Sequence, residues 1–256
     1  MEELNAIAKD ARLKVLQLIF KAQTSHIGSN FSCIEIFVSL FNKIDLDKDV
    51  FVLSAGWKAA TLYYFLYRAG RITEEQLNSY CQDGSEFIGL AEPIIPEIKI
   101  AGGSMGLGFP GAVGIAMAKK IKGEEGKVYV LMSDGELQCG TTWEAGLIAA
   151  HHKLDNLVLI VDNNGLQAMG RTKDIIDIPY LDELFSQMNW FTSFGFGHSF
   201  DFLLGALSTE PATQPHVIIA NTIKGRGVSF MQDNNLYHYA QLTDDDYEKA
   251  YNELNG

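Results

Sequence analysis

The order of apolar and polar residues along the chain predicts alternating helices and strands. Apolar side chains recur at helical spacing over residues 2–22, as in Ile7, Leu16 and Ile19, and predict a long first helix. Uninterrupted apolar runs predict short strands over residues 50–53, 128–132, 157–161 and 217–220. Further helices are expected over residues 33–41, 59–67, 142–153 and 243–254, the last with Thr243 as its N-cap.

The predicted strands are apolar on both faces, which is typical of a parallel sheet covered by helices on both sides. A helix lies between strands 128–132 and 157–161, and this order predicts a βαβ unit. A polar turn is expected at TSHIGSNFS (24–32), and a loop over 81–101. Because no repeat or linker interrupts the chain, we expect a single α/β domain over residues 1–256, with a mainly parallel sheet flanked by helices.

Composition narrows the class of protein. Apolar residues make up 47% of the 256 residues and charged residues 20%, as in a globular protein with a sizeable core. The formal net charge of −12 argues against a nucleic-acid partner, and no apolar run is long enough to cross a membrane. The N-terminus is unlike a signal peptide, and the odd number of cysteines suggests free thiols (Cys33, Cys81 and Cys139). We therefore expect a soluble cytoplasmic protein.

Two polar clusters, Ser133-Asp134-Gly135 and Asp162-Asn163-Asn164, follow neighbouring predicted strands. Ligands of parallel sheets bind beyond the carboxyl ends of the strands, so Asp134 and Asn164 are expected at one site. A carboxylate and an amide oxygen suit Mg²⁺, and a backbone carbonyl such as that of Leu166 could be a third ligand. Gly135 would let a bulky anion approach the backbone. Either cluster alone is equally typical of an ordinary turn after a strand.

The two clusters together resemble one family. The segments SDGELQCGTTWEA (133–145) and LDNLVLIVDNNGLQ (154–167) are similar to the Mg²⁺–diphosphate signature of thiamine-diphosphate enzymes, and most similar to the N-terminal section of transketolase. The resemblance implies that Asp134, Asn164 and Leu166 hold Mg²⁺, and that the ion holds the diphosphate of the cofactor. Ser133 stands where the family usually has glycine.

The resemblance continues over almost the whole chain. Transketolase segments are matched in order by TSHIGSNFS, FVLSAGWKAATLY, AGGSMGLGFPGAVGIAMAKK and TIKGRGVSFMQDN. It implies a catalytic set of His26, His238 and Glu144. It also implies a cofactor-binding set of Gly103, Met105, Gly106, Asp134, Gly135, Glu136, Asn164, Leu166, Lys224 and His238. Taken singly, the glycine-rich segment is a weak phosphate signal, and a lone histidine is more often an ordinary packed or surface residue.

The resemblance also implies a partner chain. The chain stops about where the family's diphosphate domain ends, and no segment resembles the pyrimidine domain, whose glutamate activates the cofactor. We expect that domain on a partner subunit, in a heterotetramer built on a dimer of this chain. The implied reaction transfers a two-carbon ketol unit from a ketose to an aldehyde, with small sugars as substrates.

Three positions depart from the family pattern and leave alternatives open. Trp57 and Glu92 replace histidines expected at the substrate end, and Cys139 replaces a glutamate of a carboxylate cluster between subunits. One alternative is the α-subunit of a 2-oxo acid dehydrogenase or decarboxylase, and another is a non-catalytic cofactor-binding or regulatory protein. A third is a Mg²⁺-dependent phosphate-transfer or hydrolysis enzyme, which would need only the Asp134 and Asn164 site.

Overall fold

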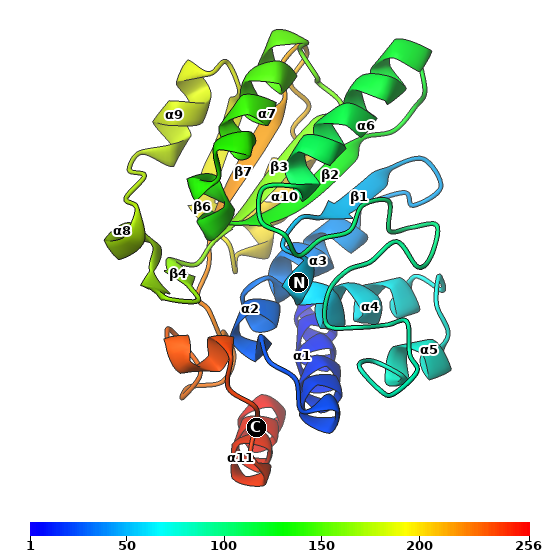
Figure 1. Cartoon of the computed structure of the whole chain (residues 1–256), viewed down its shortest axis with the longest axis vertical. Helices are drawn as coiled ribbons and strands as arrows, with labels where there is room; N and C mark the ends of the chain where they lie inside the picture. Colours follow the sequence, from blue (N-terminus) through cyan, green and yellow to red (C-terminus); the bar gives the residue numbers. More distant parts are fainter.

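The computed structural model describes residues 1–256 and is built around a five-stranded sheet (Figure 1). The strands lie in the order β1-β2-β3-β7-β6, and all four pairings are parallel. Their bounds are Val50–Leu53 (β1), Val128–Ser133 (β2), Leu157–Asn163 (β3), Phe191–Phe196 (β6) and His216–Asn221 (β7). The mainly parallel sheet of the prediction is confirmed, beside a separate antiparallel pair, Leu166–Gln167 (β4) and Gly170–Arg171 (β5).

Helices cover both faces of this sheet. One core contains residues of Glu2–Ala22 (α1), Ile34–Phe41 (α3), Ala59–Arg68 (α4) and Phe200–Ser208 (α10). The other contains residues of Gly108–Lys122 (α6), Gly140–His151 (α7) and Leu181–Gln187 (α9). Neighbouring strand residues face opposite cores, as Leu131 and Val130 do. This arrangement explains why the central strands are apolar at every position.

The remaining helical elements are short or lie at the end of the chain. They are Ile27–Ser32 (α2), Glu74–Asn78 (α5), Thr172–Ile175 (α8) and Asp244–Asn255 (α11), with 3₁₀ turns Gly56–Lys58 (η1), Asp134–Gln138 (η2) and Asn235–His238 (η3). Thr243 caps α11 as predicted, because its hydroxyl oxygen accepts the Asp246 N–H at 3.1 Å. No helix combines the length and the apolar character needed to cross a membrane.

The prediction of a turn at TSHIGSNFS is wrong, since residues 27–32 form α2. All six residues of this helix are buried, and tertiary contacts replace the missing helix propensity. Its Asn30 side chain donates to the Trp57 carbonyl at 3.2 Å and accepts the Thr61 N–H at 3.1 Å. These bonds fasten α2 to the segment after β1, at the edge of the sheet where the candidate site lies.

Candidate cofactor and metal site

A cleft of about 390 Å³ lies at the carboxyl ends of β2 and β3. The parallel register sets Ser133 beside Asp162, so the residues that follow each strand meet at the same edge of the sheet. Many of the predicted site residues line this cleft: His26, Gly103, Met105, Asp134, Gly135, Asn164, Leu166 and His238. The structure thus brings together segments that are far apart in the sequence.

Asp134 is a buried carboxylate with no cation in direct contact. It is 5% exposed and begins η2, directly after β2. Its two oxygens accept backbone N–H groups, from Gly135 at 2.9 Å and from Gly165 at 2.6 Å. Burial, with a further contribution from the charge of Asp162, raises the pKa of Asp134 to about 7. A cation bound at Asp134 would favour its ionised form and offset this burial.

Asn164 and Leu166 belong to a tight turn after β3. Gly165 between them has a φ of +73°, a left-handed conformation that favours glycine. The Asn164 side-chain oxygen accepts the Leu166 N–H at 3.1 Å, and its amide nitrogen donates to Asp162 at 3.2 Å. The turn therefore fixes which end of the amide is available on the cleft side.

The donors of this site fit Mg²⁺ in combination with an anion. A carboxylate, an amide oxygen and the Leu166 carbonyl are hard oxygen donors of the kind that Mg²⁺ prefers. The Leu166 carbonyl accepts one hydrogen bond, from Lys224 Nζ at 3.2 Å, and keeps a second lone pair. No group of three or more His, Cys, Asp or Glu side chains is placed to hold a metal ion. Water molecules or the oxygens of a bound anion would therefore complete the shell.

Lys224 and two histidines form a buried basic corner of the cleft. The Lys224 ammonium is 2.7 Å from His238 Nδ1, and the rings of His26 and His238 meet edge to face at 5.1 Å. Burial and then the charge of Lys224 lower the pKa of His26 to about 4 and that of His238 to about 3. Burial also lowers the pKa of Lys224 to about 8. Because a protonated lysine only donates, neutral His238 accepts at Nδ1 and carries its proton on Nε2.

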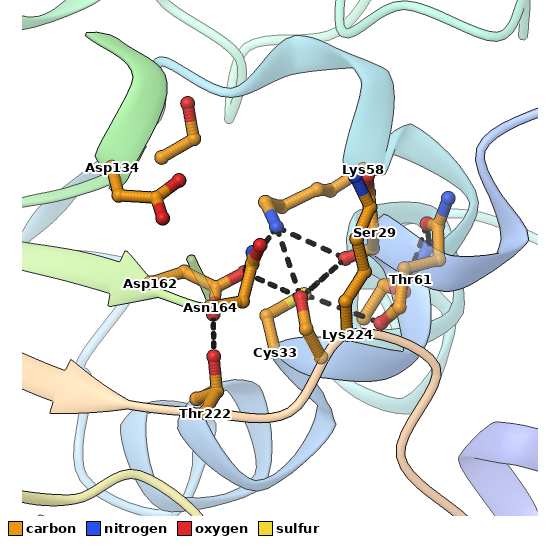
Figure 2. Close-up of polar contacts among 12 residues, drawn as sticks. Ser29, Cys33, Lys58, Thr61, Asp134, Asp162, Asn164, Thr222 and Lys224 are labelled. Atoms are coloured by element: carbon orange, nitrogen blue, oxygen red, sulfur yellow. Dashed lines mark hydrogen bonds and ion pairs between the residues drawn. The ribbon is translucent and has the colours of Figure 1, made fainter. Parts of the chain in front are cut away.

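The structure also reveals an ion pair that the sequence reasoning missed. Lys58 of η1 and Asp162 of β3 pair through side chains that are 1% and 0% exposed (Figure 2). Burial opposes the charge of Asp162, but the Lys58 ammonium outweighs it and lowers the pKa of this carboxyl group. The sequence held one signal for this pair, since Lys58 interrupts a segment of small and apolar residues and Asp162 directly follows the apolar run 157–161.

Some predicted residues lie outside the cleft lining. Glu136 is fully buried, where its carboxylate accepts the Ser54 hydroxyl and the Ser133 N–H. Lys224 lies behind the lining and reaches it through Leu166 and His238. Gly106 packs against Thr141, which donates to its carbonyl at 2.7 Å, and Glu144 is exposed on α7.

The mouth of the cleft is largely apolar. Leu90, Met105, Met169 and Tyr239 line it together with Trp57, one of the residues that depart from the family pattern. Glu92 and Cys139, the other two, are not among the lining residues. Of the three departures, only Trp57 therefore touches the space that a ligand would occupy.

Comparison with known proteins places these features in a family. The family described as "Transketolase, thiamine diphosphate binding domain" matches residues 4–255. An apulose-4-phosphate transketolase subunit of Actinobacillus succinogenes is 36% identical, over 99% of this chain and 96% of that relative. The 6-deoxy-6-sulfo-D-fructose transketolase subunit of a Clostridium species is 30% identical, over 98% of this chain and 96% of that relative.

A solved structure gives the same result at the level of the fold. The transketolase of Campylobacter jejuni superposes with a TM-score of 0.94 and 28% identity, over the whole of this chain and 43% of its own. This chain thus corresponds to less than half of that transketolase and to nearly all of the two subunit relatives.

Proposed function

The chain belongs to the transketolase family, through the thiamine-diphosphate-binding domain, and on this basis we propose that it is the diphosphate-binding subunit of a two-subunit transketolase-like enzyme. The whole of residues 1–256 acts as the diphosphate domain, and a partner chain carries the pyrimidine domain. The observation that supports this most directly is the meeting of Asp134, Asn164 and the Leu166 carbonyl in one cleft. The similarity to transketolase subunits disfavours the α-subunit of a 2-oxo acid dehydrogenase.

Thiamine diphosphate and Mg²⁺ are the proposed cofactors. Asp134 and Asn164 hold the ion through their side chains and Leu166 through its carbonyl, while Gly103, Met105 and Gly135 line the space for the cofactor. When bound, the cofactor supplies stabilisation of the carbanion that forms when the bond next to the ketose carbonyl breaks. The protein binds and orients it, with Lys224 behind the Leu166 carbonyl.

The two neutral histidines are proposed as hydrogen-bonding groups for the cofactor and substrate. His238 offers an Nε2–H donor, because Nδ1 is occupied by Lys224. His26 is held by Ser25, whose hydroxyl lies 2.8 Å from Nδ1, and its backbone N–H donates to the His238 carbonyl at 3.0 Å. These bonds fix both imidazoles at the cleft wall without a charge that would compete with the metal site.

A second copy of this chain is proposed to bind on the apolar side of the molecule that α6 and α7 form. Leu147 and Ile148 on α7 are 58% and 46% exposed, and Ile121 on α6 is 79% exposed. Exposed apolar patches, rather than single apolar side chains, mark association surfaces, and these three residues are proposed to form one. Self-association of this chain and its binding to the pyrimidine-domain subunit would give a heterotetramer, and exposed Glu144 of α7 would lie at such an interface. The three free thiols fit a cytoplasmic location.

Small sugars are the proposed substrates, with the donor carbonyl in the cleft and the sugar chain toward its mouth. Trp57 and Tyr239 at the mouth can stack on a sugar face, whereas the lysine that lines the cleft, Lys58, is paired with Asp162 and is not free to bind a phosphate. We therefore expect the partner subunit to contribute any phosphate-binding cation.

Cofactor binding by the purified full chain, mixed with its partner subunit, tests this function. Wild-type protein should bind thiamine diphosphate in calorimetry more tightly when Mg²⁺ is present, and EDTA should reverse the gain. Asp134→Ala removes the only charged ligand and should reduce the Mg²⁺-dependent affinity by at least about tenfold. A matched control is Asp177→Ala, a carboxylate outside the cleft lining. Equal affinity of wild type and Asp134→Ala, with and without Mg²⁺, would contradict the assignment.

A further inference from the structure

A buried ion pair lies directly beside the proposed cation ligands. Lys58 borders the cleft, but its ammonium points inward to Asp162, and both side chains are almost fully buried. The ammonium also donates to the Ser29 carbonyl at 3.0 Å and to the Ser32 hydroxyl at 3.3 Å. Burying two charges costs free energy, so the stability of the fold does not by itself explain an ion pair at this place.

The Asp162 carboxylate accepts four hydrogen bonds, and Lys58, Asn164 and Thr222 are among the donors that surround it in Figure 2. Its Oδ1 accepts the Thr222 hydroxyl. Its Oδ2 accepts from Lys58, from the Ser32 hydroxyl and from the Asn164 amide nitrogen. Only an ionised carboxylate accepts at every position, and Lys58 supplies the charge that keeps it ionised inside the protein.

This arrangement decides the orientation of the Asn164 amide. The oxygen and nitrogen ends of an amide have nearly the same shape, so packing alone does not distinguish them. Asp162 is an acceptor at 3.2 Å and therefore requires the nitrogen end, while the Leu166 N–H requires the oxygen end. A flipped amide would set oxygen against a carboxylate and N–H against N–H. With the amide held, the oxygen is the end available to a cation in the cleft.

We propose that Lys58 and Asp162 are positioning residues that hold Asn164 with its oxygen toward the cation. Neither touches the cation or the cofactor, and both act through the amide. This role rests on the proposed function, because it presupposes a cation at Asn164. A pair that only stabilised the fold would leave the metal dependence of binding unchanged, and that difference can be measured.

The test uses a charge-free double variant, Lys58→Ala/Asp162→Leu. It removes both members together and shifts apolar volume from one position to the other, so neither member of the pair is left inside without its partner. The quantity to measure is the ratio of the thiamine-diphosphate dissociation constants without and with Mg²⁺, by calorimetry on the full chain mixed with its partner subunit. We expect this ratio to fall by at least about tenfold, because a group that orients a metal ligand is typically worth 10–100-fold in affinity.

Lys119→Met is the matched control. Lys119 is also buried, and it donates to the Lys48 carbonyl at 3.0 Å. Lys48 precedes β1, so this bond lies at the end of the strands opposite the cleft. The Lys119→Met variant should keep the wild-type ratio of dissociation constants, even where its melting temperature falls. If the double variant does not fold, Lys58→Met/Asp162→Asn takes its place with an expected loss of about threefold or more, because an asparagine both donates and accepts.

The outcomes separate this proposal from the proposed function. A folded double variant with a wild-type ratio would overturn the positioning role and leave the proposed function standing. Wild-type protein that binds no thiamine diphosphate even when mixed with its partner subunit, with or without Mg²⁺, would overturn the proposed function itself. A lowered ratio in Lys119→Met would show that the ratio follows stability, and that result would also overturn the positioning role.

Discussion

At the scale of single residues, burial sets the protonation state of several histidines. His216, the first residue of β7, is 1% exposed, and its Nε2 lies 2.9 Å from the Ser193 hydroxyl. Burial and then the charge of Lys127 lower the pKa of His216 to about 4. The folded protein therefore holds a neutral imidazole at a pH where the unfolded chain would already be protonated.

This difference predicts a loss of stability in mild acid. His216 contributes fully above the unfolded pKa of about 6.5, and its contribution falls as the pH drops from 6.5 toward 4. Its share of the loss at pH 5 is on the order of 2 kcal/mol. His216→Gln can still bond Ser193 but does not titrate, so its free energy of unfolding should fall less between pH 7.5 and pH 5. The free energies of unfolding are measured by urea titration. Equal decreases for the wild type and His216→Gln between pH 7.5 and pH 5 would contradict the lowered pKa of His216.

At the scale of elements, most of the sheet and the placement of Asp134 and Asn164 at its edge could be predicted, because both depend on local pattern. Strands β2, β3 and β7 are continuous apolar runs, and Asp134 and Asn164 follow two of them directly. The edge strand β6 was not predicted, since Phe191–Phe196 has no buried residue and no apolar run. The pair Lys58 and Asp162 was missed because it joins residues 104 positions apart, which only the folded chain brings together.

Two glycines of α6 should respond oppositely to alanine. Gly114 lies within the helix and an added Cβ would meet no atom within 4 Å, so Gly114→Ala should stabilise the protein by about 0.5–1 kcal/mol. Gly123 ends the helix with a φ of +67° in equally open space, so Gly123→Ala should destabilise it by about 1 kcal/mol. Thermal unfolding of both variants checks this pair, and a loss of stability in Gly114→Ala would show that the exposed side of α6 is already covered by another chain.

At the scale of the whole molecule, the chain exposes apolar residues on α6 and α7, and it has a candidate cofactor cleft that the account leaves for a partner to complete. We expect self-association through this side at micromolar concentration. Leu147→Glu places a charge on it and should shift the sedimentation profile toward monomer. Tyr251→Glu is the control, because Tyr251 is 46% exposed on α11 and lies outside the proposed interface. A wild-type chain that is already monomeric would contradict the proposed dimer.

The central claim is that this chain forms half of an enzyme that transfers two-carbon units. It is tested most directly by mixing the purified chain with a purified pyrimidine-domain subunit from the same cell, in the presence of thiamine diphosphate and Mg²⁺. Ketol transfer is then assayed with a panel of ketose phosphates and aldehyde acceptors. We expect transfer by the mixture, none by either chain alone, and none when Asp134→Ala replaces the wild type. Transfer by this chain alone would contradict the account, as would an inactive mixture in which both chains and the cofactor are bound.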